Sequence, residues 1–164
     1  MSIVTLNDRG VRSVTTFGSV SGGSMVFIKK LTASSSSDLS FVNGSSDVVL
    51  DSTYKEYVFT FKNIHAGTDG AELTVGFRDG STDYDATKTT TVFEAYHNEA
   101  GNDSGLAYQT AEDIAQGTGF QNISKNLGTD NDQNAGGYLH LFNPSSTTFV
   151  KHFISRLNNY QHNE

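Results

Sequence analysis

The sequence predicts an all-β protein, an antiparallel β-sandwich of the jelly-roll kind with one short helix. Short apolar runs alternate with Gly, Asn and Asp turns, and two of these runs place apolar or aromatic side chains at every second residue. No repeated strand–helix–strand pattern occurs. With 164 residues the chain suits a single domain. We expect an N-terminal arm at residues 1–20 and a sandwich domain at residues 21–164.

The two clearest strands lie at residues 57–62 and 72–78. In the first, Tyr57, Phe59 and Phe61 share one face. In the second, the inward residues are Leu73, Val75 and Phe77. A Gly- and Asp-containing segment joins the two runs, so we expect them to be neighbours in one sheet.

Further short apolar runs predict additional strands at residues 25–31, 39–42, 48–50, 89–97, 138–142 and 147–157. Asn43-Gly44 predicts a hairpin because both residues tolerate positive φ, and Pro144 predicts a turn into the last strand. Residues 110–116 are the one helical segment, with Thr110 as the candidate N-cap and Gly117 as the stop.

Composition restricts the classes of partner. The net charge of -7 repels the phosphates of nucleic acid. The absence of Cys excludes disulfides, thiolate metal sites and Cys nucleophiles. No apolar stretch approaches the roughly 20 residues that cross a bilayer, and the N-terminus has no signal-peptide pattern. We therefore expect no nucleic-acid or membrane partner and a product made in a cytoplasm.

Two acidic loops are candidate metal sites. Residues 130–136 begin like a calcium loop, but Ala135 stands where that loop needs Gly and Leu141 where it needs Glu. The second loop holds Asp79, Asp83 and Asp85. Solvated polar loops are the favoured interpretation of both. No metal site is predicted from the five scattered histidines, namely His65, His97, His140, His152 and His162.

No motif for catalysis or for a cofactor is present. The chain lacks a nucleophile elbow, a phosphate loop and a dinucleotide fingerprint. His97 and Glu99 have the spacing of zinc deaminases, but the cysteines of that signature are missing. Tyr84, Tyr96 and Tyr108 lie in or beside polar loops and could form a sugar-binding platform, although core or interface roles are commoner for such residues. We expect no enzymatic activity.

Several segments resemble a family of virion structural proteins common in tailed phages of marine bacteria, including cyanophages and pelagiphages. The likeness runs in order along nearly the whole chain, through residues 7–12, 28–37, 51–57, 130–133 and 141–153. It implies a β-rich particle component, a tail appendage, fibre or head decoration protein, without catalytic residues. Members of the family continue with further strands beyond the equivalent of Asn159-Tyr160. The expectation is that the sandwich closes differently here or leaves an edge for a neighbour.

The favoured hypothesis is therefore a non-enzymatic subunit of a phage virion, contacting copies of itself and other capsid or tail proteins in a symmetric assembly. The candidate docking arm lies within residues 2–17, where the apolar residues are Ile3, Val4, Leu6, Val11, Val14 and Phe17. The alternative is a receptor- or glycan-binding module at a fibre tip, with Tyr84 and Tyr96 contacting a host surface glycan. A polysaccharide hydrolase is the third class, and it would require a pair of carboxylates at a defined separation.

Overall fold

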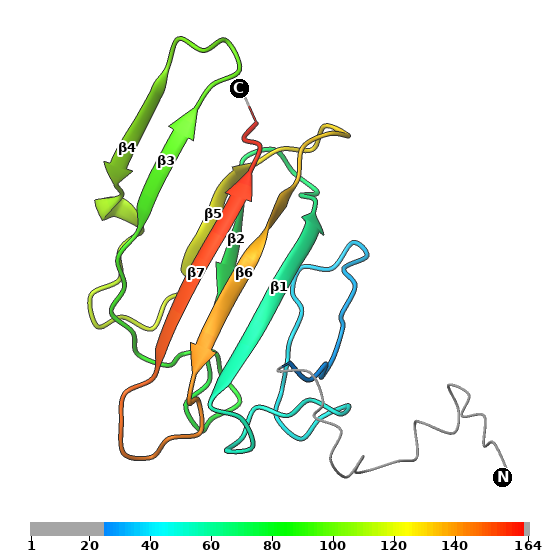
Figure 1. Ribbon diagram of the computed structural model, residues 1–164, viewed down its shortest axis with the longest axis vertical. Helices are drawn as coiled ribbons and strands as arrows, with labels where there is room; N and C mark the ends of the chain where they lie inside the picture. Colours follow the sequence, from blue (N-terminus) through cyan, green and yellow to red (C-terminus); the bar gives the residue numbers. More distant parts are fainter. Residues whose placement is uncertain (1–24, 163–164) are drawn as a thin grey trace, which may run out of the picture. The chain divides into compact units, whose positions relative to one another are not determined.

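The computed structural model describes residues 25–162 of the chain (Figure 1). The chain divides into two compact units, Met1–Val49 and Leu50–Glu164. The expected arm at residues 1–20 lies outside the described residues. Within residues 25–162, no helix combines the length and apolarity needed to cross a bilayer.

In the first unit, residues 25–49 contain no strand and no helix. The strands predicted at residues 25–31, 39–42 and 48–50 are therefore wrong. The Asn43-Gly44 turn does form: Gly44 has φ +77° and its N–H donates to the Val48 carbonyl at 2.9 Å. The predicted hairpin does not extend from it, because no ladder of paired backbone groups continues on either side of the turn.

The regular structure of the described chain lies in residues 50–162, which form seven strands and one 3₁₀ turn. The elements are β1 (Glu56–Ile64), β2 (Ala71–Val75), β3 (Phe93–His97), β4 (Ser104–Tyr108), η1 (Thr110–Glu112), β5 (Gln121–Leu127), β6 (Ala135–Phe142) and β7 (His152–Asn159). They form an antiparallel three-stranded sheet in the order β1-β6-β7 and two antiparallel pairs, β2-β5 and β3-β4.

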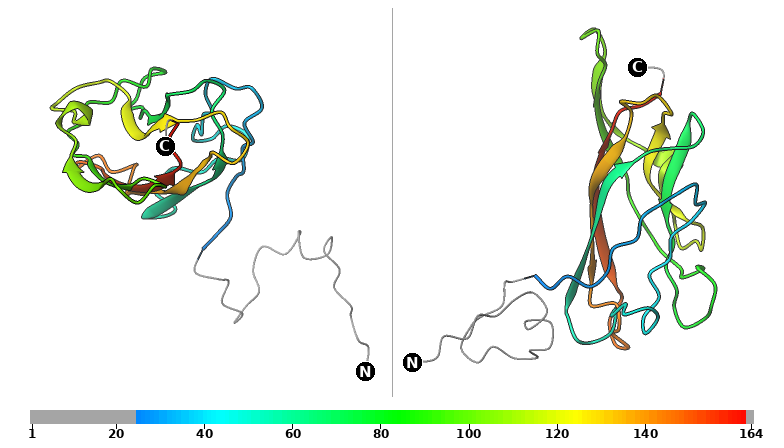
Figure 2. Two further views of the ribbon diagram at one scale, coloured as in Figure 1. Left: turned by 90° about the horizontal axis from the view of Figure 1, so that it is seen from above. Right: turned by 90° about the vertical axis from the view of Figure 1, so that its right-hand side faces the viewer.

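The β1-β6-β7 sheet and the β2-β5 pair form two layers, which the right-hand view of Figure 2 shows side by side. The fold is thus all-β and sandwich-like, as predicted. Tyr57, Leu139 and Leu141 are buried on the inner face of the first layer and Leu127 in the second. Phe77 and Phe153 meet with ring centroids 5.0 Å apart. Jelly-roll connectivity is not established by these sheet orders and stays a prediction.

Side-chain alternation was predicted correctly, but strand pairing was not. On β1, Tyr57, Phe59 and Phe61 are more buried than Val58, Thr60 and Lys62, as expected for one core-facing side. The expectation that β1 and β2 are neighbours is wrong, because β1 pairs with β6 and β2 with β5. β1 and β2 are consecutive but lie in different layers, so each of them pairs with a strand far along the chain.

Three elements differ from the prediction around residues 100–127. The strands β4 and β5 were not predicted, and the helix expected at residues 110–116 is reduced to η1. Thr110 is not its N-cap, since Gln109 occupies that position. The chain leaves the helical path at Asp113, whose carboxylate accepts the Val92 N–H at 3.0 Å, and Ile114 N–H donates to the Thr90 hydroxyl. These tertiary hydrogen bonds outcompete a marginal one- or two-turn helix.

Candidate functional site

The β3-β4 hairpin forms a sheet of its own and extends past the ends of its neighbours at the upper left of Figure 1. Its turn follows from the sequence around Asn98, whose side-chain oxygen accepts the N–H groups of Asn102 and Asp103, each at 3.1 Å. Gly101 adopts φ +69°, a conformation that glycine reaches without strain. The two strands then run back in register with one another.

One side of this hairpin is an exposed apolar surface. Phe93 lies opposite Tyr108 and Ala95 opposite Leu106, so their side chains share one side of the pair. Phe93 is 70% exposed, Leu106 79% and Tyr108 49%. The rings of Phe93 and Tyr108 are 5.2 Å apart. We refer to Phe93, Ala95, Leu106 and Tyr108 as the hairpin face.

The opposite side of the hairpin is anchored by Glu94. Its carboxylate pairs with the Lys125 ammonium at 3.0 Å and accepts hydrogen bonds from the side-chain amides of Gln109 at 2.6 Å and Gln161 at 2.9 Å. These contacts connect β3 to the residue after β4, to β5 and to the end of the described chain. Because the polar side is held inward, the apolar hairpin face is directed outward.

Tyr108 and Asp113 reinforce the base of the hairpin. The Tyr108 hydroxyl donates to the Asp113 carboxylate, while the other carboxylate oxygen accepts the Val92 N–H. The hydrogen bond to Asp113 raises the pKa of the Tyr108 phenol, so this hydroxyl stays protonated as a donor. The position of one aromatic ring of the hairpin face is thereby fixed.

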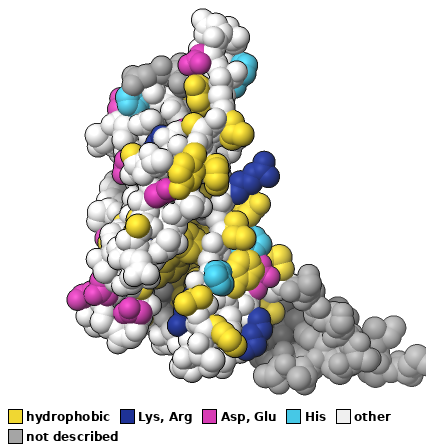
Figure 3. All heavy atoms as spheres, turned by 90° about the vertical axis from the view of Figure 1, so that its left-hand side faces the viewer, with side chains coloured by type: hydrophobic (Ala, Val, Ile, Leu, Met, Phe, Trp, Pro, Cys, Tyr) yellow, Lys and Arg dark blue, Asp and Glu magenta, His cyan; other side chains and the backbone are white. Residues whose placement is uncertain are grey.

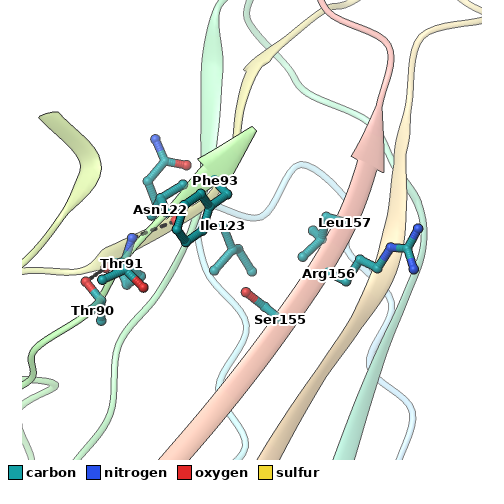
Figure 4. A pocket seen from close by; sticks show the side chains of 10 residues that line it. Thr90, Thr91, Phe93, Asn122, Ile123, Ser155, Arg156 and Leu157 are labelled. Atoms are coloured by element: carbon teal, nitrogen blue, oxygen red, sulfur yellow. Dashed lines mark hydrogen bonds between the residues drawn. The ribbon is translucent and has the colours of Figure 1, made fainter. Parts of the chain in front are cut away.

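A cavity of about 200 Å³ lies between β7, β5 and the segment leading into β3. Figure 4 shows side chains from these three elements around it. Its lining is mostly uncharged and includes Val92, Phe93, Asn122, Ile123 and Leu157. The amide nitrogen of Asn122 is buried and has no hydrogen-bond partner among residues 25–162. Phe93 belongs to the hairpin face and also lines the cavity, so the two features adjoin at this residue.

The outer face of the β1-β6-β7 sheet carries a row of rings along β6. Tyr138 and His140 meet edge to face at 5.0 Å, and Phe142 lies 6.1 Å beyond His140. The Glu56 carboxylate on β1 contacts Nδ1 of His140. A hollow of about 270 Å³ opens at one end of the row, lined by Tyr138, Arg156, Asn158 and the backbone of Gly136-Gly137. Planar aromatic and polar groups therefore share this face.

The structure does not bring the predicted site tyrosines together. Tyr84 lies in the loop after β2, with the Arg78 guanidinium 4.3 Å from its ring centre and Phe120 on another side at 6.3 Å. Its hydroxyl is buried without a hydrogen-bond partner. Tyr96 is 41% exposed and lies across Gly105 of the paired strand. The candidate docking residues, Ile3, Val4, Leu6, Val11, Val14 and Phe17, lie outside the described residues.

The acidic loops are organised by their own side chains. The Gln133 side chain is buried and accepts the Asp130 N–H at 3.3 Å, and the Asp130 carbonyl contacts His65. In the other loop, the Ser81 hydroxyl accepts the Asp83 N–H at 3.0 Å. Across residues 25–162, no three His, Asp or Glu side chains gather in a group that could hold a metal ion.

The hairpin face was only partly visible in the sequence. Phe93 fell within a predicted strand and Tyr108 was singled out as a loop aromatic, but Leu106 was not identified. The available signal was the alternation of Leu106 and Tyr108 after the Gly101-Asn102 turn. No protein-family model, no curated protein and no solved structure matches the chain.

Proposed function

We propose that this chain is a non-enzymatic structural subunit of a tailed-phage virion, at the head exterior or on a tail appendage, acting through repeated contacts with copies of itself and other virion proteins. The virion setting rests on the sequence resemblance. The mode of action rests on one structural observation, the excess of exposed over buried hydrophobic side chains in the second unit.

Within residues 50–162, five hydrophobic residues are buried, namely Tyr57, Leu127, Ala135, Leu139 and Leu141. Ten large ones are exposed: Val58, Phe93, Tyr96, Leu106, Tyr108, Phe120, Tyr138, Phe149, Val150 and Ile154. Single exposed hydrophobic residues are normal on soluble proteins, but contiguous groups such as the hairpin face mark interaction surfaces. A subunit that is buried in an assembly would have such a surface.

Light scattering and sedimentation of the full chain over a concentration series test this proposal. We expect reversible oligomers, or binding to virus particles that lack the protein. Leu106→Asp should weaken association at least tenfold with little change in folding stability, because Leu106 is exposed in the subunit. Ser104→Asp is the matched control on the same side of the hairpin, outside the apolar cluster. A tight monomer that also fails to bind particles would refute the proposal.

A glycan-binding module at a fibre tip is the second candidate. The observation that favours it is the outer hollow, where Tyr138 offers a ring for stacking on a sugar and Arg156 and Asn158 offer hydrogen-bond donors. Of the three tyrosines first considered, Tyr84 has its ring against Arg78 and Phe120, which leaves Tyr96 and Tyr108. Saturable binding to host polysaccharide that Tyr138→Ala abolishes would support this function over the first.

A further inference from the structure

The middle of β7 is an open sheet edge. β7 is the last strand of the β1-β6-β7 sheet, and no strand within the described residues pairs with its other side along residues 155–157. Among the described residues, the cover on this edge lies at its C-terminal end, where the side-chain amide of Asn159 donates to the Lys125 carbonyl at 3.0 Å. Just beyond the strand, the His162 N–H donates to the Asn126 carbonyl at 2.8 Å. Edge strands present unpaired N–H and C=O groups that accept a further strand.

The open edge borders the cavity and, through Phe93, the hairpin face. Ser155, Arg156 and Leu157 line the cavity from β7. We call the combined surface the acceptor groove: residues 155–157, the cavity and the hairpin face. Figure 3 shows hydrophobic side chains gathered along this side of the molecule, some of them in a hollow. The groove thus combines unpaired backbone with uncovered apolar side chains.

The chemistry of the groove fits a peptide strand better than a small molecule. At about 200 Å³ the cavity is smaller than the roughly 300–1,000 Å³ of small-molecule pockets. A small ligand would also leave Leu106 and Tyr108 uncovered. An added strand would satisfy the backbone groups of β7 and direct alternate side chains into the cavity.

We propose that the acceptor groove binds residues 3–17 of a neighbouring copy as an added β-strand. This inference rests on the proposed function and names the contact through which copies associate. The segment is rich in β-branched and apolar residues, which favour strands. Twenty-four residues precede Met25, and an extended segment of that length spans up to about 80 Å, enough to reach an adjacent subunit.

Charge also favours this segment as the occupant. Residues 1–24 carry Arg9 and Arg12 against Asp8, a net charge of +1. Residues 50–164 carry 7 Lys and Arg against 15 Asp and Glu, a net charge of -8. Contact between the second units of two copies would therefore bring together two strongly acidic bodies. The N-terminal segment of the neighbour avoids that repulsion.

Disulfide trapping tests the contact, because the chain has no Cys of its own. Ser155→Cys places a thiol on β7 beside the groove, and Ser13→Cys, Thr15→Cys and Thr16→Cys place thiols on both sides of the arm. Each arm variant is mixed with an isotopically heavy Ser155→Cys chain under mild oxidation. The control partner is Thr60→Cys, an exposed position on β1. We expect at least one mixed dimer to form ten or more times faster with Ser155→Cys than with Thr60→Cys.

Equal rates with Ser155→Cys and Thr60→Cys would overturn the inference. So would a chain carrying both the arm and Ser155→Cys changes that forms only an internal disulfide, since the segment would then bind its own chain. The oligomeric mass of the unmodified protein in solution distinguishes a failure of the groove contact from a failure of the proposed function. An oligomer without groove cross-links removes the inference and keeps the proposed function, whereas a tight monomer without particle binding removes both.

Discussion

Gly137 of β6 lies against the backbone of β7 with no room for a side chain. A Cβ built there would lie 2.2 Å from the Arg156 carbonyl oxygen and 2.7 Å from the Leu157 Cα. These are backbone atoms, so no rotamer change relieves the overlap. Gly137 also has φ +155°, which L side chains rarely adopt. Close strand packing at the centre of the three-stranded sheet therefore depends on the absence of a side chain at this position.

We expect Gly137→Ala to lower the free energy of unfolding by about 3 kcal/mol, the upper end of ordinary single substitutions. Urea unfolding followed by circular dichroism measures the change. Gly67→Ala is the control, since a Cβ at Gly67 meets no atom within 4 Å. Equal effects of the two substitutions would show that the close approach of β6 and β7 does not limit stability.

Asp69 connects the start of β2 to the loop after β5. One carboxylate oxygen accepts both the hydroxyl and the N–H of Thr129, each at 2.8 Å. The hydroxyl bond and then the N–H bond lower the pKa of Asp69 below its ordinary value of 3.8. Because the pKa is lower in the folded state, this stabilisation is fully present above the unfolded value and is lost as the pH falls through the folded value.

Asp69→Asn should therefore reduce stability at neutral pH and have little effect in strong acid. The measurable outcome is a smaller difference between the urea midpoints at about pH 7 and about pH 2.5 than in the unchanged chain. Asp132→Asn, at an exposed position in a nearby loop, provides the comparison. If both variants kept the full pH difference, the Thr129 contacts would have no role in it.

At the level of elements, side-chain alternation was easier to predict than strand pairing. The period-two pattern identified the inward faces of β1 and β2, because burial on one side of a strand is a local property of the sequence. Their pairing is not local: Tyr57 meets Leu141 and Leu73 meets Ser124, far along the chain. No feature of either strand alone specifies such a partner.

Contacts between residues far apart in the sequence also explain why the predicted helix does not form. Residues 110–116 have acceptable local propensity, but Asp113 and Ile114 bond to Val92 and Thr90, some twenty residues earlier. β5 was missed because Gln121 and Ser124 are buried polar residues in it, which hides the apolar alternation of a strand. The Gln121 amide is satisfied by the carbonyls of Glu112 and Asn122, contacts that only the folded chain contains.

The attachment of the β3-β4 hairpin depends on Glu94. We expect Glu94→Ala to remove the contacts with Lys125, Gln109 and Gln161 and to destabilise the hairpin locally by about 2 kcal/mol. Hydrogen exchange should then be at least tenfold faster in β3 and β4, with β6 unchanged. Glu72→Ala, on the exposed side of β2, is the control. A uniform change across all strands would argue against a separately anchored hairpin.

For the whole molecule, composition and pattern predicted the all-β class but not the candidate site. The hairpin face and the open edge of β7 both arise from pairing: β3 with β4 alone, and β7 with β6 on one side only. The basic excess in residues 1–24 and the acidic excess in residues 50–164 can be counted from the sequence. That these residues belong to two separate compact units became visible only in the fold. The virion assignment stays a proposal based on resemblance, and the exposed apolar surface is what makes an assembly role physically reasonable.

The anchoring of the hairpin also has a geometric consequence. Glu94 joins it to β5 through side chains, and its two strands share a ladder with no other strand. Small changes in rotamer could therefore tilt the hairpin while every sheet stays intact. In the virion assembly proposed above, identical subunits on a curved shell or a tapering fibre would meet at slightly different angles. A pivoting contact of this kind would let one chain fit several of those positions without refolding.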